Sequence, residues 1–473
     1  MAVFSLDIPL ELLPEIFYHI RYPQDLCKLC QVNKTFHHFA TPLLYERIYI
    51  FSWHKHGKLN ALQVIRLFKN LSQYPHVAQF VRKLEIRDFP KAFSSDDDVD
   101  ILQKVTEGLR NCTNLRSCTW TRDGSLSSEI LKALQSSQTL QELEINGHDQ
   151  GNYDSQLLLQ FTRLRKISLV MPSLTVISVL QPWLQITGKT LRSLTIICKS
   201  SPILNNAKLE LLAPYLSEVE HLHLAGCSKI THEGIRAVLC ANDRGLLSLG
   251  LEGLSPQFDM LQFRLDCTRM NAFHRLRSIT LTVNHQTSLD IWANEVAALL
   301  PKTVPLETFQ IYSSGAFIES QPGTERLWAD LVTAHKHRLV RFSVHRILLS
   351  LSAIEDICRR CTKLEQLFIV IEQSSVNNLS RCLPLVSNLR TLHVNFPLEA
   401  SQLENATPVL PESDALTIVE RCVSIQQFGC NTRVWQVERD VLFDETSSPI
   451  GIKRRLTRYQ GLDIPEAFMV VRT

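Results

Sequence analysis

The stretch VEHLHLAGCSKITHEGI, residues 219–235, decides the fold of this chain. Its first part follows the order LxxLxL and ends at Cys227, a pattern that predicts a short strand and then a corner. From Ile230 to Leu239 apolar residues recur at roughly helical spacing, which predicts a helix. A strand, a corner and a helix make a unit of about 28 residues that cannot bury its own apolar face, so the unit must stack on copies of itself.

Copies of this unit run along most of the chain. The first apolar residue of the predicted strand stands at thirteen positions: Val81, Leu115, Leu140, Leu164, Leu191, Val219, Leu246, Leu276, Leu306, Leu339, Leu364, Leu389 and Ile425. The intervals between them, 24 to 36 residues, are typical of leucine-rich repeats that carry a helix. The chain therefore resembles an α/β solenoid, a leucine-rich-repeat horseshoe with a parallel inner sheet and outer helices.

Amphipathic helices are predicted between the strands, for example over 128–134, 208–216, 291–300 and 354–361. The longest stretches without a clear repeat pattern are 254–272, 313–325 and 397–413. We expect these three to form irregular insertion loops at a rim of the solenoid, where partners commonly bind.

The first fifty residues have a different pattern, which predicts three short helices. Asp7 and Pro9 suit a helix start, and apolar residues at spacings of three and four follow up to Ile20. A second helix is expected from Pro23, and a third that ends before Pro42. Three short helices make a marginal core, so we expect the module to be completed by a partner or by the next domain.

This segment resembles the F-box, on the residues Ile8-Pro9-Leu10-Glu11-Leu12-Leu13-Pro14-Glu15-Ile16-Phe17, then Asp25-Leu26, Val32 and Phe36. Pro42-Leu43-Leu44-Tyr45 resembles the closing segment of fungal F-box proteins. The family implies docking on the Skp adaptor of a cullin–RING ubiquitin ligase. By the same resemblance, the adaptor-binding residues are Ile8, Pro9, Leu12, Leu13, Ile16, Phe17, Leu26, Leu29 and Val32. The residues alone leave open a plain helical bundle that caps the repeats.

The predicted domains are the F-box (1–52), a helical linker and N-terminal cap (53–80), about thirteen repeats (81–436) and a C-terminal cap (437–473). The linker is expected to be helical over 59–71, because the first repeat needs a cover for its core. After Ile425 the strand pattern weakens, which is why the last segment is interpreted as a cap.

The predicted inner face of the sheet is nearly neutral. Its charged positions in the first twelve units are four of each sign: Lys83, Glu85, Arg87, Glu142, Glu144, Lys166, Glu252 and Arg341. Nucleic-acid binding requires several phosphates to be neutralised, so this face favours a protein ligand. Tyr312, Phe368 and Val370 are the candidate substrate anchors, because aromatic and apolar side chains dominate interaction hot spots.

Other candidate sites have weaker patterns. His221 and His223 lie two apart on one strand, and without an identifiable carboxylate or thiol partner we interpret them as exposed polar residues. The pairs Cys27/Cys30 and Cys358/Cys361 lie too far apart in the chain to form one zinc site. The run 96–100 lacks the glycine and glutamate of a calcium loop. No phosphate-binding glycine loop or nucleophile elbow is found, so we expect no catalysis, cofactor or metal.

Composition agrees with a globular, intracellular protein. The 473 residues have a formal net charge of +3, and the only basic run is Lys453-Arg454-Arg455. No apolar run reaches membrane-spanning length, and the N-terminus lacks the features of a signal peptide. Thirteen scattered cysteines without an export signal indicate reduced thiols. We therefore expect a cytoplasmic or nuclear location, with no membrane and no nucleic-acid partner.

The resemblance implies the substrate-recognition subunit of a Skp–cullin–F-box ubiquitin ligase, in which the F-box holds the adaptor and the repeats bind an unknown protein substrate. The subunit itself would not be an enzyme. An alternative is a leucine-rich-repeat scaffold whose F-box acts outside a ligase. A third possibility, an RNA-binding solenoid, predicts salt-dependent binding to polyanions, which the neutral inner face disfavours.

Overall fold

The computed structural model describes residues 9–20, 22–51, 57–89, 97–149, 151–284, 288–314, 317–397, 410–444 and 449–459. The chain divides into two compact units, Met1–Ile197 and Cys198–Thr473. The division into four domains by sequence pattern remains a prediction.

The first unit opens with a small helical module made of η1 (Leu10–Leu12), α1 (Leu13–Tyr18), α2 (Pro23–Leu29) and α3 (Lys34–Glu46). The expectation that the third helix ends before Pro42 is wrong, because α3 continues through this proline. Proline removes one helical N–H donor. The loss is tolerated because Leu43 and Leu44, beyond the proline, pack on the core of the module.

The module leads directly into a parallel sheet. The strands of the first unit are β1 (Arg47–Ile50), β2 (Lys83–Ile86), β3 (Ser117–Trp120), β4 (Glu142–Asn146), β5 (Lys166–Val170) and β6 (Ser193–Ile197). They pair in chain order. The segments between them contain α4 (Gly57–Gln73), α5 (Pro75–Ala78), α6 (Asp97–Asn111), α7 (Ser128–Gln135), η2 (Ser155–Gln160) and α8 (Leu174–Thr187). Strand β1 was not predicted, whereas the linker helix expected over 59–71 is present as α4.

The second unit continues the alternation of strand and helix. Its parallel strands are β7 (His221–Ala225), β8 (Ser248–Glu252), β9 (Ser278–Asn284), β10 (Thr308–Ser314), β11 (Arg341–His345), β12 (Gln366–Val370), β13 (Thr391–Asn395) and β14 (Gln427–Cys430). Its helices are α9 (Asn206–Leu212), η3 (Ala213–Leu216), α10 (His232–Ala241), α11 (Met260–Met270), α12 (Leu289–Leu299), α13 (Pro322–His335), α14 (Leu351–Arg360), η4 (Gln373–Asn378), α15 (Leu379–Cys382), η5 (Leu383–Leu385) and α16 (Glu412–Arg421).

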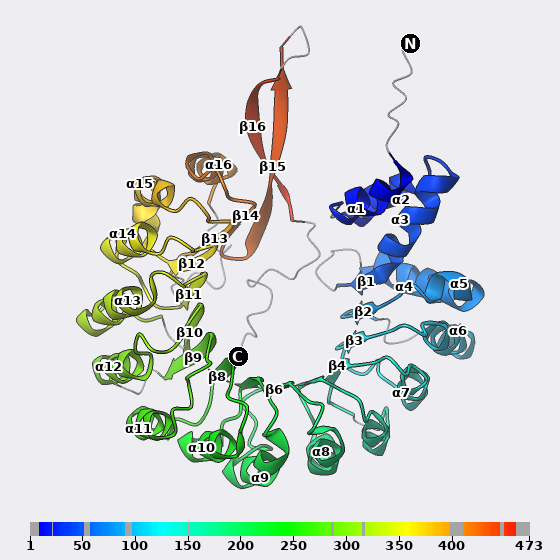
Figure 1. The fold of residues 1–473 in the computed structure, drawn as a ribbon, viewed down its shortest axis with the longest axis horizontal. Helices are drawn as coiled ribbons and strands as arrows, with labels where there is room; N and C mark the ends of the chain where they lie inside the picture. The colour runs from blue at the N-terminus through cyan, green and yellow to red at the C-terminus, as the bar shows by residue number, and fades with distance from the viewer. Residues whose placement is uncertain are drawn as a thin grey trace. The chain divides into compact units, whose positions relative to one another are not determined.

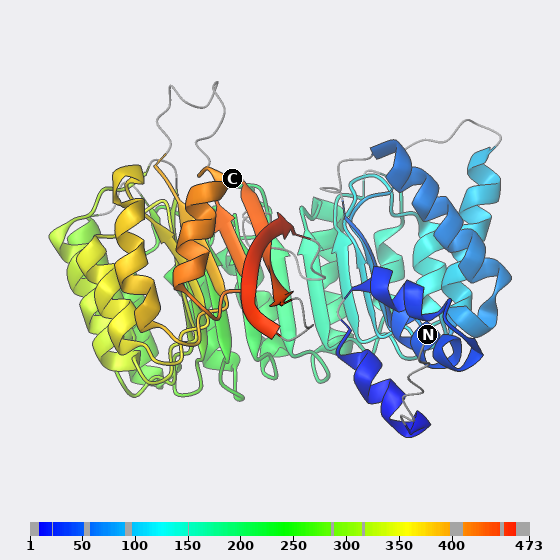
Figure 2. The ribbon, with the colours of Figure 1, turned by 90° about the horizontal axis from the view of Figure 1, so that it is seen from above.

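The repeat positions predicted from the sequence coincide with the strands of the sheet. Each of the thirteen marker residues is buried, and each stands two residues before the start of a strand, β2 to β14. Within a strand the side chains alternate, so that Leu222 and Leu224 of β7 are buried in the core while His221 is exposed. In each unit the helices between the strands lie on one side of the sheet (Figure 1, Figure 2). The α/β solenoid class is thereby confirmed. We call the other side, where no described helix between strands lies, the open face.

Two of the expected loops are corrected. Residues 254–272 contain α11, whose first turn is capped by Asp259, since its carboxylate accepts from the Gln262 amide at 2.9 Å. The helix ends at Asn271, which has a left-handed φ of 48°. Helix α13 begins within the second expected loop, at Pro322. Of the third, 398–409 lie outside the described residues.

The predicted C-terminal cap begins with an antiparallel hairpin. Strand β15 (Arg433–Phe443) pairs with β14 over its first residues and with β16 (Pro449–Arg458) along its length. Trp435 of β15 stacks on Phe428 of β14, with ring centroids 5.8 Å apart, and this contact covers the end of the core. Residues 460–473 lie outside the described part of the chain.

Candidate protein-interaction surfaces

The N-terminal module has a very small core. Leu13, Phe17, Leu26 and Ala40 are buried, and half-buried apolar side chains of the three helices surround them. The rings of Phe17 and Phe36 meet edge to face with centroids 5.1 Å apart. At the start of α3 the Asn33 side chain accepts from the Phe36 amide at 2.8 Å, which fixes the turn before this helix. Such a core is marginal for a module of this size.

Several apolar side chains of the same module face solvent. Leu10 is 55% exposed, Leu12 49%, Ile16 43% and Val32 59%. Isolated exposed apolar residues are ordinary on protein surfaces, but four within the first two helical turns and the α2–α3 connection are dense for so small a module. They make this segment a candidate docking surface.

The nine residues expected to bind an adaptor therefore fall into different environments. Leu13, Phe17 and Leu26 belong to the core of the module, and Leu29 is half-buried against it. The exposed members are Pro9, Leu12, Ile16 and Val32. Ile8 lies outside the described residues. Helical spacing places Leu12, Leu13, Ile16 and Phe17 on one stripe of the first helical segment. It does not separate the side chains that face the core from those that face solvent.

Most charges on the open face of the first unit lie in ion pairs. Arg47 Nε lies 2.7 Å from a carboxylate oxygen of Glu85, and Lys83 Nζ lies 3.6 Å from the other oxygen. Arg87 and Glu144 form a second pair at 2.9 Å. The first cluster keeps one net positive charge and the second none, so this face offers little attraction to a polyanion.

His223 has a carboxylate partner that the sequence pattern did not reveal. Its Nε2 lies 2.7 Å from Oε1 of Glu252 on the next strand. The ring reaches this carboxylate by lying over Gly250, where an added Cβ would stand only 2.5 Å from the ring carbon Cδ2. The interpretation of His223 as a histidine without a nearby carboxylate is therefore wrong. The sequence did contain an indication of this contact, because the residue at the same position of the following repeat is the glycine Gly250.

A row of stacked rings crosses the open face of the second unit from β10 to β13. Tyr312 stacks on His345, with centroids 4.5 Å apart and planes within 9°, and Phe368 stacks on His393 at 5.9 Å. The guanidinium of Arg341 lies 4.9 Å from the Phe368 centroid. The row ends at Gly429, where a Cβ would stand 2.0 Å from His393 Nδ1. We call Tyr312, His345, Phe368 and His393 the ring row.

The ring row changes the interpretation of the three candidate substrate anchors. Phe368 is 3% exposed and Val370 2%, so neither forms an exposed anchor in this structure. Phe368 is enclosed because its neighbours in the row and Arg341 cover its two faces. Tyr312, at the β10 end of the row, is half-buried.

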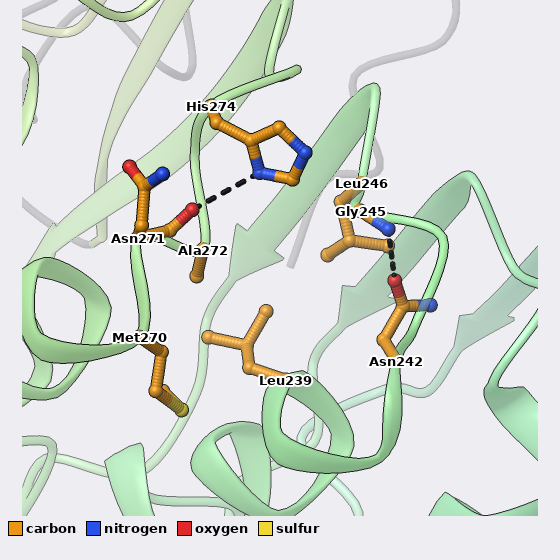
Figure 3. Close-up of a pocket in the computed structure, with 8 residues that line it drawn as sticks. All are labelled: Leu239, Asn242, Gly245, Leu246, Met270, Asn271, Ala272 and His274. Atoms are coloured by element: carbon orange, nitrogen blue, oxygen red, sulfur yellow. Dashed lines mark hydrogen bonds between the residues drawn. The ribbon is translucent and has the colours of Figure 1, made fainter.

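A recess lies beside the turns that follow α10 and α11 (Figure 3). It is lined by Leu239, Asn242, Gly245, Leu246, Met270, Asn271, Ala272 and His274. Its polar side chains serve the turns themselves, since the Gly245 amide donates to Asn242 Oδ1 at 2.7 Å and His274 Nδ1 lies 3.0 Å from the Asn271 carbonyl. This recess is a structural feature of two repeat turns.

The two cysteine pairs of the sequence lie in different environments. Cys27 is exposed, whereas Cys358 and Cys361 are buried, and burial raises the pKa of the Cys361 thiol to about 12. A thiol with so high a pKa is neither a good nucleophile nor a ready ligand at neutral pH. Nowhere in the described ranges do three or more His, Cys, Asp or Glu side chains gather as metal ligands would.

None of the helices described here is long and apolar enough to span a bilayer.

The family described as F-box-like matches residues 5–51, the segment that contains the N-terminal module. The F-box protein DAS1 of Saccharomyces cerevisiae is 31% identical over 154 residues, which are 30% of this chain and 20% of that protein. The match therefore spans about a fifth of the length of this curated relative. This chain carries an F-box-like domain at its N-terminus and is similar to a yeast F-box protein.

Two solved structures that match this chain have low sequence identity to it. The leucine-rich repeat-containing protein LegL7 of Legionella pneumophila is 12% identical, covers 76% of this chain and 91% of its own, and has a TM-score of 0.31. The structure of the yeast Rad7 and Elc1 complex gives 13% identity, 71% and 77% coverage, and a TM-score of 0.35.

Proposed function

We propose that this protein is the substrate-recognition subunit of a Skp–cullin–F-box ubiquitin ligase. The F-box-like module docks on the Skp adaptor, and the repeats bind the protein that is to be ubiquitinated. The observation that carries the proposal is the F-box-like module itself, whose small core leaves apolar side chains in water. The chain would act without catalytic residues of its own, because holding a substrate beside the transfer machinery accelerates transfer by proximity.

The exposed apolar residues of the module are the proposed adaptor contacts. Leu12, Ile16 and Val32, with Pro9 and the half-buried Leu29 beside them, present the surface. Full burial of such side chains contributes about 1.5–3 kcal/mol each, and roughly half of that remains available for a side chain already half-buried. The buried Leu13, Phe17 and Leu26 support this surface from within.

The open face is the proposed substrate surface. Its ion pairs in the first unit leave little net charge, which favours a protein ligand over a polyanion. In the second unit Tyr312 is the proposed contact residue, since it is the half-buried member of the three candidate anchors. Phe368 and Val370 would act by holding the ring row in place.

The proposal is tested by co-purification of the tagged chain with a Skp adaptor and a cullin. The variant Leu12→Asp with Ile16→Asp places two charges on the exposed surface of the module, and we expect it to lose both partners. The matched control is Leu62→Asp with Leu174→Asp, which changes two other exposed leucines on α4 and α8. We expect the control to retain both.

The outcomes separate the candidate functions. Adaptor binding that survives in the Leu12→Asp/Ile16→Asp variant contradicts the docking surface. Retention of the adaptor without a cullin favours a scaffold whose F-box acts outside a ligase. Loss of adaptor binding in the control variant would show that added charge on any exposed leucine damages the protein. It would therefore also contradict the assignment of Leu12 and Ile16 to the docking surface.

A further inference from the structure

The C-terminal hairpin extends beyond the repeat that it caps. Figure 1 shows β15 and β16 standing out past the end of α16. Only the first part of β15 pairs with β14, so the remainder of the hairpin is a two-stranded ribbon. Two-stranded ribbons are marginal in water unless something packs on them.

The base of the hairpin is fastened to the solenoid. Arg454 donates to the carbonyls of Val419 and Glu420 in the last turn of α16, at 3.1 and 2.7 Å. Arg439 donates to the Val423 carbonyl at 2.7 Å. Cations at the C-terminus of a helix are favourable, so these contacts fix the direction in which the hairpin projects.

The distal part of the hairpin exposes apolar side chains. Val441 is 48% exposed, Leu442 43%, Phe443 60%, Ile450 65% and Ile452 64%. Val441 and Ile452 are directly opposite each other in the ladder and so lie on the same face. An exposed apolar cluster on a projecting, firmly based ribbon is typical of a contact surface.

Strand β16 is also the last strand of the second unit within the described residues, so no described strand pairs with its outer edge. Strand edges accept a further strand through their backbone N–H and C=O groups. The charges of β16 select which strand fits, since it carries Lys453, Arg454, Arg455 and Arg458 and no acidic residue.

Two of these cations are engaged within the chain, since Arg454 binds α16 and Arg455 pairs with Glu438 at 2.7 Å. Lys453 and Arg458 make no ion pair with any described residue. Side chains alternate along a strand, so Arg458 lies on the face of Ile450 and Ile452, whereas Lys453 lies on the other face with Arg455. Cross-strand pairs of opposite charge stabilise a sheet and like charges opposite each other destabilise it. A second copy of β16 would place cations against cations, whereas a strand that alternates apolar and acidic residues would set carboxylates beside Lys453 and apolar side chains beside Ile452.

We propose that the outer edge of β16, with the exposed apolar residues of the hairpin, binds an extended segment of a partner protein that alternates apolar and acidic residues. The segment adds to the hairpin as a further strand. Two available cations are too few for a nucleic acid, which needs many phosphate contacts, and the apolar cluster would then have no use. Binding does not require the adaptor, so this inference stands or falls separately from the proposed ligase role.

The test uses the full chain without adaptor and a fluorescein-labelled synthetic peptide of the length of β16 that alternates valine and glutamate. We expect its fluorescence anisotropy to rise on addition of the chain. The same peptide with N-methyl groups on alternate residues along the pairing edge loses the backbone donors, and a valine–lysine peptide has the wrong charge, so neither should bind. Lys453→Glu should weaken binding of the valine–glutamate peptide about fivefold.

Matched variants separate the edge from general effects. Lys302→Glu makes the same change in net charge at another exposed position and should bind as the unmodified chain does. Ile452→Ser should weaken binding without a change of charge. Absence of binding by the valine–glutamate peptide, equal binding by its N-methylated or lysine form, or no effect of the Lys453 change overturns the proposal. Tighter binding of oligothymidine than of the peptide would also overturn it.

Discussion

Replacement of Gly429 by alanine tests the packing of the open face most directly. The new Cβ would stand 2.0 Å from Nδ1 and 2.5 Å from Cε1 of His393, far inside contact distance. The ring has little freedom to move, because it is 2% exposed, stacks on Phe368, and has Nε2 3.1 Å from both Asn395 Oδ1 and the Asn431 carbonyl. Overpacking of this kind costs about 1–3 kcal/mol, and displacement of the ring adds about 1 kcal/mol for a lost hydrogen bond.

Replacement of glycine by alanine also restricts the unfolded chain, which offsets about 0.4–1 kcal/mol of this cost and leaves about 1–3.6 kcal/mol. Repeat proteins open locally, so hydrogen exchange of β13 and β14 measures the change better than a single unfolding midpoint. We expect these amides to exchange roughly 5- to 400-fold faster, since 1.36 kcal/mol is a factor of ten. The matched control is Gly451→Ala, where an added Cβ meets nothing within 4 Å.

A double-mutant cycle isolates the ring as the cause. In a His393→Ala background the space over residue 429 is empty, so Gly429→Ala should cost less than about 0.5 kcal/mol there. Equal costs in the two backgrounds, or exchange in Gly429→Ala no faster than in Gly451→Ala, would refute the packing argument.

Three further outcomes follow from the same structure. Gly250→Ala should cost only about 1 kcal/mol in hydrogen exchange of β7 and β8, because the histidine ring above it is more exposed and has room to turn. Leu13→Asp should speed hydrogen exchange of α1 and α3 in the full chain, whereas Leu12→Asp should not, since Leu13 is buried and Leu12 is half exposed. Cys361 should resist iodoacetamide at neutral pH while the exposed Cys240 reacts, as mass spectrometry would show. Because burial raises the pKa of Cys361 from 9.0 to about 12, its contribution to stability is complete below pH 9 and falls as the pH rises toward 12, which alkaline unfolding would measure.

The interior repeats were predictable because each repeat has copies of itself as neighbours. In such a stack the LxxLxL pattern alone determines which side chains enter the core, and all thirteen marker residues are buried accordingly. Residues 254–272 were the exception in the interior. Their helix α11 buries the polar Asp266 beside Phe263 and Cys267 and exposes the apolar Leu261 and Leu265, so its apolar periodicity is weak, and its Asp259 cap was the stronger signal.

Side-chain environments were less predictable than elements, since they depend on two segments at once. Helical spacing groups Leu12, Leu13, Ile16 and Phe17 on one stripe, yet α3 covers only Leu13 and Phe17. On the sheet, His223 and His393 each lie over a glycine of the following strand. A pattern read within one repeat does not include that glycine. Comparison of the same position in successive repeats would have found both, because only a residue without Cβ leaves room for the ring.

The first and the last strands of the repeat array differ from the interior strands for one physical reason. A row of paired strands leaves an unpaired strand edge where it begins and where it ends. At the first end, β1 adds a strand directly after the helical module, and its Arg47 pairs with Glu85 of β2. At the other end, β15 reverses direction and covers β14, which ends the parallel array but creates a new edge at β16. Four cations on that strand make it a poor edge for a second copy of itself. The edge therefore disfavours a second copy of the same strand by charge, whereas the proposed strand of alternating apolar and acidic residues would use both Lys453 and the exposed apolar side chains beside it.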